Sequence, residues 1–199
     1  MLKVALTGGI ATGKSHVLGL CRSHGLACLD ADELAHGVTA AGTEATAAIA
    51  ERFGAGLLAP DGSVDRSKLG PIVFADPAAR RDLDAIVHPA VYRAIGAALR
   101  GFELLGYPLV VVDVPLLYES GHEKDFDRVI VTACDIETQR ARLRARGLNE
   151  TAAEQRIAAQ WPTEQKAARG DFVIRTDGTL EETARRVADV VAILKSSNP

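Results

Sequence analysis

The chain has 199 residues, a length that suits one domain with a sizeable core and small appendages. Hydrophobic residues make up 47% and charged residues 25%, which excludes a disordered or membrane-spanning chain, and the formal net charge of −3 argues against a general nucleic-acid binder. Three cysteines without C-x-x-C spacing indicate reduced thiols. We therefore expect a cytoplasmic protein that has no membrane or nucleic-acid partner and no obligate protein partner.

Short apolar segments alternate with helical patterns along the chain, which predicts parallel βαβ units. The expected strands cover residues 3–7, 26–30, 109–114, 128–132 and 172–175. The run Leu109-Val110-Val111-Val112 is apolar on both faces, as in a strand covered by helices on each side. Asp76-Pro77, an N-cap followed by proline, marks one helix start. Thr179 and Glu182 form a capping box that opens a C-terminal helix.

Two segments are longer than a simple crossover between neighbouring strands needs. Residues 33–106 carry several helical patterns, so we expect a helical insertion there. The helical patterns fall at residues 43–53, 77–87 and 90–105, and a turn is expected at residues 60–62. Residues 136–169 form a second helical segment, which is rich in arginine. No low-complexity linker separates these segments, so both are expected to belong to a single domain that covers residues 1–199.

A phosphate-binding loop follows the first expected strand. The G-x-x-x-x-G-K-[ST] pattern is matched in full by Gly8-Gly9-Ile10-Ala11-Thr12-Gly13-Lys14-Ser15. Glycines let backbone N–H groups curl around an anion, and the helix that starts here adds its positive end. Lys14 supplies a charge for the β- and γ-phosphates of ATP, and Ser15 is placed to hold Mg²⁺. The alternative, a chance glycine-rich turn, is disfavoured by the strand–turn–helix context.

Three aspartates fall at the carboxyl ends of expected strands, where ligands bind in open α/β sheets. Asp113 is a candidate Mg²⁺ partner through water, or a strand-end aspartate that caps a turn. The sequence after it is not that of a GTPase switch, and no N-K-x-D tetrapeptide occurs. Asp30 and Asp32 are two residues apart, so in an extended segment both face the same way. Asp32 is a candidate general base, or the N-cap of a helix that starts at Glu33.

These motifs and several later ones resemble those of the dephospho-CoA kinase family from Met1 to about Leu194, nearly the whole chain. The first matching pieces are the phosphate loop, Leu29-Asp30-Ala31-Asp32 and His88-Pro89. The match continues through Val114-Pro115-Leu116-Leu117-Tyr118-Glu119 and an arginine-rich region with Gln139, Arg142, Leu143, Arg146, Arg156, Ile157, Gln160 and Lys166. Only the phosphate loop is decisive alone, but the ordered set is specific.

The resemblance implies a three-layer α/β fold of the P-loop NTPase type. A five-stranded parallel sheet would carry a helical acceptor-binding insertion at residues 33–106 and a helical lid at 136–169. The implied reaction moves the γ-phosphate of ATP to the ribose 3′-hydroxyl of dephospho-CoA, the last step of coenzyme A synthesis. ATP and dephospho-CoA would be the substrates and Mg²⁺ the metal.

The same resemblance implies roles for individual residues. The ATP phosphates would be bound by Gly8, Gly9, Ala11, Thr12, Gly13, Lys14, Ser15 and His16. Asp32, Lys14 and Arg142 would be catalytic. Lid cations for the transition state would be Arg142, Arg146 and Arg156. The acceptor would be bound by Asp30, Asp32, His88, Leu116 and Glu119. Mg²⁺ would be held by Ser15 directly and by Asp113 through water.

Some of these roles have structural alternatives. The arginines could form a solvated helix face paired with Glu137, Glu150 and Glu154. His88 could be an ordinary residue before proline. Three positions also depart from the family pattern: Ala11 replaces a glycine, His16 replaces a small residue, and Asp177 stands where asparagine usually precedes Gly178.

Two other functions stay open from the sequence. One is another small-molecule kinase of the same fold, acting on a nucleoside, a nucleotide or another alcohol. The other is a regulatory module that binds ATP without transferring phosphate. Asp32 and the arginine-rich segment disfavour the module, because a passive binder needs neither.

Overall fold

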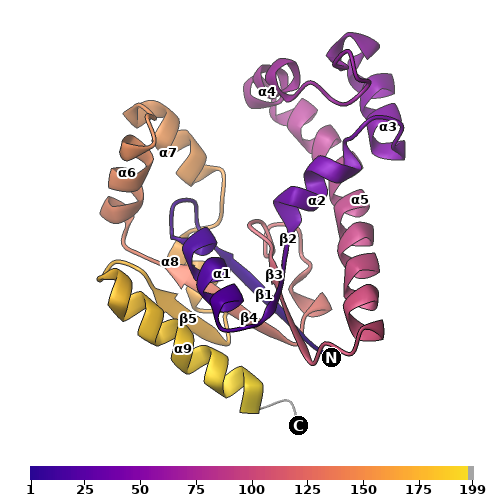
Figure 1. Cartoon of the computed structure of the whole chain (residues 1–199). Helices are drawn as coiled ribbons and strands as arrows, with labels where there is room; N and C mark the ends of the chain where they lie inside the picture. Colours follow the sequence, from indigo (N-terminus) through magenta and orange to yellow (C-terminus); the bar gives the residue numbers. More distant parts are fainter. Residues whose placement is uncertain (197–199) are drawn as a thin grey trace. The chain divides into compact units, whose positions relative to one another are not determined.

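A parallel sheet forms the centre of the computed structural model, which describes residues 1–196 (Figure 1). Its five strands are β1 (Leu2–Gly8), β2 (Ala27–Asp30), β3 (Leu109–Asp113), β4 (Arg128–Ala133) and β5 (Phe172–Arg175). Their order in the sheet is β2-β3-β1-β4-β5, and every neighbouring pair is parallel. The predicted strands are therefore confirmed to within one or two residues. Asp113 pairs with both Leu6 and Asp30, so β3 ends beside the strand that leads into the phosphate loop.

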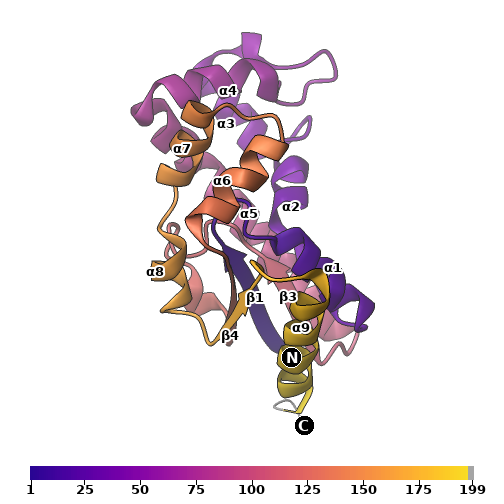
Figure 2. The same cartoon turned by 90° about the vertical axis from the view of Figure 1, so that its left-hand side faces the viewer.

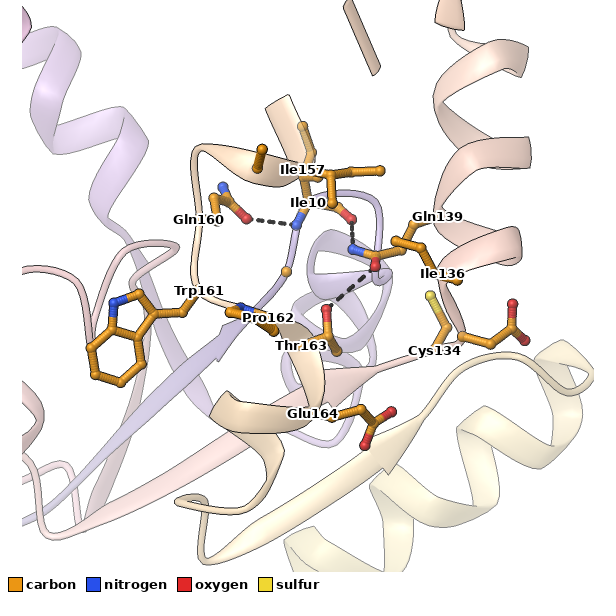
Figure 3. Close-up of a pocket in the computed structure, with 13 residues that line it drawn as sticks. Ile10, Cys134, Ile136, Gln139, Ile157, Gln160, Trp161, Pro162, Thr163 and Glu164 are labelled. Atoms are coloured by element: carbon orange, nitrogen blue, oxygen red, sulfur yellow. Dashed lines mark hydrogen bonds between the residues drawn. The ribbon is translucent and has the colours of Figure 1, made fainter. Parts of the chain in front are cut away.

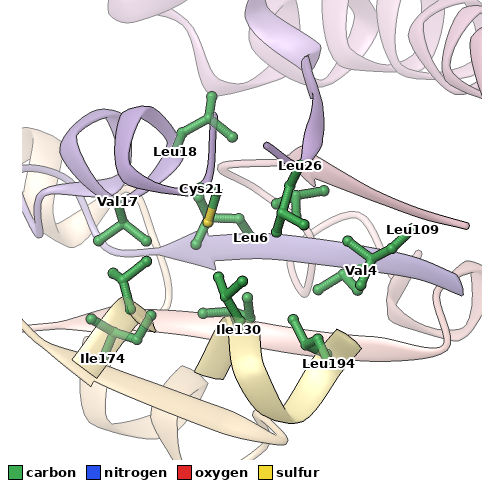
Figure 4. Packing of buried hydrophobic residues seen from close by; sticks show 13 residues of the cluster. Val4, Leu6, Val17, Leu18, Cys21, Leu26, Leu109, Ile130, Ile174 and Leu194 are labelled. Atoms are coloured by element: carbon green, nitrogen blue, oxygen red, sulfur yellow. The ribbon is translucent and has the colours of Figure 1, made fainter. Parts of the chain in front are cut away.

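Two helices build the main core against one face of this sheet. Helix α1 (Lys14–Ser23) and helix α9 (Leu180–Ser196) contact each other. Val4 and Leu6 of β1 pack against Val17 of α1 and Leu194 of α9 in one buried cluster (Figure 4). Each such side chain contributes about 1.5–3 kcal/mol when it is fully buried. This packing holds both ends of the phosphate loop, because β1 enters the loop and α1 leaves it.

The predicted capping box is confirmed at the start of α9. The Thr179 N–H donates to Glu182 Oε2 at 3.0 Å, and the Glu182 N–H donates to Thr179 Oγ1 at 3.2 Å. This reciprocal pair satisfies two backbone donors that a helix end would otherwise leave unbonded.

Three helices follow β4 and connect it to β5. They are α6 (Ile136–Ala145), α7 (Glu150–Ala158) and α8 (Thr163–Ala167). Helices α6 and α7 extend beyond the carboxyl end of β4, whereas α8 returns beside the sheet (Figures 1 and 2). Arg140 of α6 links α6 to α7, because it lies 2.7 Å from Glu154 of α7. It also lies 2.6 Å from Glu137 of its own helix. A short 3₁₀ helix, η2 (Glu123–Asp125), precedes β4.

The chain divides into two compact units, of which the sheet unit comprises Met1–Asp30 and the chain from Phe102 onward. The second unit, Ala31–Gly101, is helical and has its own core. Its elements are α2 (Ala31–Val38), α3 (Glu44–Phe53), η1 (Ala55–Leu57), α4 (Arg66–Ala75) and α5 (Pro77–Leu104), the last of which runs on past the unit. Ile49, Leu57, Val64 and Leu69 form its buried cluster. None of the helices among the described residues is both long and apolar enough to cross a membrane.

Two helix expectations in this second unit are wrong. The separate helices at 77–87 and 90–105 are one helix, α5, which continues through Pro89. Proline there removes one backbone donor, and packing of flanking residues such as Val91 and Ile95 keeps the helix continuous. The helix expected to start at Glu33 instead begins at Ala31, so Asp32 lies in its first turn and does not precede it.

Candidate nucleotide site

The phosphate loop connects β1 to α1 in the predicted strand–turn–helix order. Gly13, the N-cap residue of α1, has a left-handed backbone with φ 89°. The His16 and Val17 N–H groups both donate to the Gly13 carbonyl at 3.1 Å. The N–H groups ahead of them are the ones that a helix start leaves for an anion, and the helix dipole favours an anion there. Lys14 is half-buried in this turn, whereas Ser15 and His16 are exposed.

Two glycines of the loop are required by close contacts. A Cβ atom on Gly8 would lie 2.2 Å from Thr132 Oγ1. One on Gly9 would lie 2.3 Å from Thr163 Oγ1 and 2.8 Å from Gln139 Nε2. Real Cβ atoms do not approach so closely, so the loop can sit against β4, α6 and α8 only with glycine at both positions.

Hydrogen bonds of three buried threonines hold the phosphate loop in place. Thr12 Oγ1 donates to the Gly9 carbonyl at 2.7 Å and lies 2.7 Å from Thr132 Oγ1 of β4. Thr176 Oγ1, just after β5, donates to the Thr12 carbonyl at 2.7 Å. All three side chains are buried, where an unmade hydrogen bond would be costly, so the network favours a single loop conformation.

Ala11, which replaces a glycine of the family pattern, has a left-handed backbone with φ 60°. That conformation costs a residue with a Cβ about 1–2 kcal/mol. The Ala11 carbonyl accepts from Arg142 Nη1 at 3.0 Å, and Arg142 Nη2 donates to the Thr176 carbonyl at 2.5 Å. Arg142 therefore braces the strained residue and links it to the loop after β5.

Asp177, in the loop after β5, also departs from the family pattern, and it forms an ion pair. Its carboxylate lies 2.5 Å from Arg175 Nη2. The hydrogen bond from Arg175 holds the pKa of the Asp177 carboxyl below its usual range. Arg175 also lies 2.9 Å from Glu164 of α8, so this ion pair connects the end of β5 to α8.

Oxygen donors suited to Mg²⁺ lie at the same edge of the sheet as the phosphate loop. Asp30 and Asp113 occupy paired positions at the ends of β2 and β3, and Asp113 is buried. Ser15 offers a hydroxyl in the first turn of α1. The described residues contain no group of three or more histidine, cysteine or acidic side chains placed to hold a metal. A hydroxyl and carboxylates at one sheet edge fit Mg²⁺, which keeps several waters and usually binds through one or two carboxylates and substrate phosphates.

The other predicted site residues fall in different parts of the chain. Asp32 is exposed in the first turn of α2 and, like His88 of α5, belongs to the second unit. His88 Nε2 lies 3.7 Å from Asp84 Oδ1 within α5. Arg146 and Arg156 are exposed at the ends of α6 and α7. Leu116, between β3 and η2, is half-buried.

Glu119 takes part in a buried ion pair. Its Oε1 lies 2.7 Å from Lys166 Nζ of α8 and also accepts the Trp161 N–H at 2.9 Å. Lys166 is fully buried and donates to the Pro115 carbonyl at 3.1 Å. Burial lowers the pKa of the Lys166 ammonium, and the hydrogen bond to Glu119 partly offsets that effect. The pair joins α8 to the chain that follows β3.

A cavity of about 590 Å³ lies beside the loop, entirely within the sheet unit (Figure 3). Its wall is formed by Gly9 and Ile10, the β4–α6 junction, the end of α7 and residues 160–164. Trp161 lines it and stacks with Tyr118, whose ring centroid is 6.0 Å away, and the Arg169 guanidinium lies 4.9 Å from the Trp161 ring centroid. The charged side chains among its lining residues are acidic, Asp135 and Glu164, so this cavity does not suit the phosphates.

Comparison with known proteins decides between the kinases that this fold could support. A family model described as dephospho-CoA kinase matches residues 2–182. The chain belongs to the dephospho-CoA kinase family. A dephospho-CoA kinase from Symbiobacterium thermophilum is 49% identical over 185 residues, which are 92% of this chain and 77% of that protein.

Two solved structures match this chain over nearly its whole length. TT1252 from Thermus thermophilus has a TM-score of 0.80 at 34% identity and is covered over 97% of both chains. Dephospho-CoA kinase from Campylobacter jejuni has a TM-score of 0.75 at 26% identity, with 99% of this chain and 98% of that one covered. The predicted P-loop α/β fold and kinase activity are confirmed, and a kinase of this family uses ATP.

Sequence reasoning missed several residues of this kinase site. Gln139, Gln160 and Lys166 were matched to the family without a role, yet each contacts the loop or the chain beside it. The sequence suggests no role for Thr132 or Thr176. A polar residue at a strand end or inside a helix has no local signal that shows which distant carbonyl it will meet.

Proposed function

We propose that this chain transfers the γ-phosphate of ATP to the ribose 3′-hydroxyl of dephospho-CoA, giving coenzyme A and ADP. The observation that carries the proposal is a complete phosphate loop in a chain that matches the dephospho-CoA kinase family from residue 2 to residue 182. The new bond joins the acceptor 3′-oxygen to the γ-phosphorus, and the bond from that phosphorus to the β–γ bridging oxygen breaks.

The phosphate loop binds and orients the donor. Backbone groups from Gly8 to His16 surround the phosphates, and Lys14 places its charge on the β- and γ-phosphates. Ser15 would hold Mg²⁺, and Asp113 would assist through water. When bound, Mg²⁺ neutralises charge that develops on the phosphate oxygens. The hydroxyl and carboxylate at this sheet edge support that assignment.

Asp32 orients the acceptor hydroxyl and accepts its proton, since a ribose hydroxyl is a poor nucleophile. Asp30 helps to bind the acceptor from the end of β2. Residues 33–106 form the helical insertion that binds the rest of the acceptor, with His88 among its contacts. Leu116 and Glu119 are acceptor-binding residues as well. The ion pair of Glu119 with Lys166 supports a fixed carboxylate position there.

Residues 136–169 act as the lid, and Arg142, Arg146 and Arg156 stabilise the transition state. The exposed side chains of Arg146 and Arg156 support a role as cations that approach the phosphates when the lid closes. Arg142 acts from its position against the Ala11 carbonyl, where it supports the loop and adds positive charge. In this proposal residues 1–199 work as one kinase domain, although the chain folds as two compact units.

The enzyme works in the cytoplasm without an obligate protein partner, nucleic acid or membrane. Three free cysteines support a reducing compartment. Its partners in this role are the two small-molecule substrates.

A coupled ADP-release assay over a panel of acceptors tests the substrate. Dephospho-CoA should stimulate ADP release far above adenosine, uridine, AMP or shikimate. Lys14→Ala is the control for contaminating kinases, because that variant lacks the charge on the γ-phosphate and should lose more than about nine-tenths of its turnover. An equal or higher rate with any other acceptor would exclude dephospho-CoA as the preferred substrate.

A further inference from the structure

Two glutamine side chains hold both main-chain polar groups of Ile10, in the phosphate loop. Gln160, which follows α7, accepts the Ile10 N–H through Oε1 at 2.8 Å. Gln139 of α6 donates from Nε2 to the Ile10 carbonyl at 2.6 Å. Figure 3 shows the two amides on opposite sides of Ile10. The bonds come from two separate elements and meet at one residue of the loop.

Backbone chemistry determines how each amide is oriented. A main-chain N–H can only donate and a carbonyl can only accept, so Gln160 must present oxygen and Gln139 must present nitrogen. The Thr163 hydroxyl donates to the remaining Gln139 oxygen at 3.4 Å. Gln139 is only 4% exposed, and its Nε2 lies 2.8 Å from the position that a Cβ on Gly9 would take.

We propose that Gln139 and Gln160 are positioning residues that fix the conformation of the phosphate loop for nucleotide binding. The residues between them, 140–159, carry Arg142, Arg146 and Arg156. Both ends of the arginine-bearing segment are therefore hydrogen-bonded to Ile10. These two bonds fix the position of the segment relative to the loop that binds the phosphates.

The functional consequence is preorganisation of the loop. Donors aimed at an anion bind it well when they are already in place, because no reorganisation is then needed on binding. Ile10 lies within the phosphate loop, and releasing either of its bonds frees the chain between Gly9 and the strained Ala11. The inference rests on the proposed function only in that the loop binds the phosphates of ATP and ADP.

Replacing glutamine with glutamate should weaken nucleotide binding at position 139 but not at position 160. Gln160→Glu keeps an oxygen for the Ile10 N–H, whereas Gln139→Glu replaces the donor to the Ile10 carbonyl with a repelling oxygen. Gln155→Glu, on the exposed face of α7, is the matched control for the added charge in the same segment. Affinity for MgADP, measured by isothermal titration calorimetry, requires no acceptor, so the result is independent of whether dephospho-CoA is the substrate.

Gln139→Glu should weaken MgADP binding by about 10–100-fold relative to Gln155→Glu, the range expected when a buried hydrogen-bonding group loses its partner. Gln160→Glu should stay within about threefold of the same control, while Gln160→Ala should lose about tenfold. Trp161, the single tryptophan of the chain, gives a fluorescence titration as a second readout beside Gln160.

Thermal melts separate positioning from general destabilisation. The proposal requires weaker MgADP binding at 25 °C in a variant that is still fully folded at that temperature. If Gln139→Glu does not fold, Gln139→Met keeps the length without the charge and should still weaken binding about tenfold. Equal loss in Gln139→Glu and Gln160→Glu would assign the effect to charge, and MgADP affinity in Gln139→Glu equal to that of Gln155→Glu would overturn the proposal.

Discussion

Asp32 is the residue at which a catalytic and a helix-stabilising role make different predictions. It lies in the first turn of α2, where a carboxylate interacts favourably with the helix dipole by about 0.3–1 kcal/mol. Asn retains the size and some hydrogen bonding of Asp, but it cannot accept a proton at neutral pH. The two roles therefore separate in a single substitution.

We predict that Asp32→Asn lowers kcat by about 10²–10⁴-fold while the melting temperature and MgADP affinity stay nearly unchanged. Steady-state kinetics with dephospho-CoA, a thermal melt and calorimetry measure the three quantities. Asp30→Asn is the matched control at the neighbouring carboxylate and should lose less. Near-normal kcat in Asp32→Asn would leave this residue a helix-dipole role and make Asp30 the candidate base.

Two cysteine thiols predict how stability responds to alkaline pH. Burial raises the pKa of Cys21 to about 12 and that of Cys28 to about 11. An unfolded thiol titrates near pH 8.5, so between about pH 9 and 11 the folded chain keeps protons that the unfolded chain releases. The folded state is then favoured below pH 9 and loses that advantage as pH rises.

We therefore predict that the free energy of unfolding falls above pH 9, by up to about 1.4 kcal/mol per pH unit for each thiol. Urea denaturation at pH 8, 9 and 10 measures the slope. Cys21→Ala should be less stable at pH 8 but should show a shallower decline. Identical pH slopes in the two proteins would show that Cys21 does not contribute to the alkaline loss.

At the scale of elements, a buried ion pair attaches α8 to the chain that follows β3. Lys166 contacts Glu119, the Pro115 carbonyl and, at 3.5 Å, the Gly8 carbonyl at the start of the phosphate loop. Removing one member of a buried ion pair leaves the other charge desolvated, which typically costs 3–5 kcal/mol. Replacing both members with neutral groups avoids that cost.

We predict that Lys166→Met destabilises the protein by about 3–5 kcal/mol and that adding Glu119→Gln restores part of the loss. Chemical denaturation of both single variants and the double variant gives the coupling energy. Lys124→Met, at an exposed lysine of η2, is the control and should change stability by less than about 0.5 kcal/mol. Purely additive losses would mean that the pair has no energetic coupling.

At the scale of the whole molecule, ligand binding should be visible as stability. A ligand that binds only the folded state adds about 2.7 kcal/mol at 100 times its Kd. The phosphate loop is formed by β1, α1 and contacts from β4, α6 and α8, so its ligand stabilises the sheet unit as a body.

We predict that MgADP raises the melting temperature of the wild-type protein in a concentration-dependent way and that Lys14→Ala loses most of this shift. Scanning calorimetry over a series of MgADP concentrations measures it. Lys3→Ala, a substitution in β1 before the loop, is the matched control and should keep the shift. The same shift in Lys14→Ala as in the wild type would contradict the assignment of Lys14 to the phosphates.

Much of the fold and of the loop could be predicted because the relevant signals are local. Strands such as 109–113 appear as apolar runs, the start of α9 as a capping box, and the phosphate loop as a pattern with fixed spacing. The expectation of a helix break at Pro89 is wrong because it also rests on a local signal. A local rule predicts a break, whereas the packed residues on either side keep α5 continuous.

The sequence by itself determined the sheet, the phosphate loop and the family, because each depends on residues that are neighbours along the chain or on an ordered set of motifs. Tertiary structure alone decided what holds the loop. Gly9 must be glycine because Thr163 and Gln139 meet it, and Ala11 keeps its left-handed backbone against Arg142. Lys166 is buried because Glu119 faces it. These contacts join residues far apart in the chain, and no periodicity or spacing encodes which distant side chain will fill a given space.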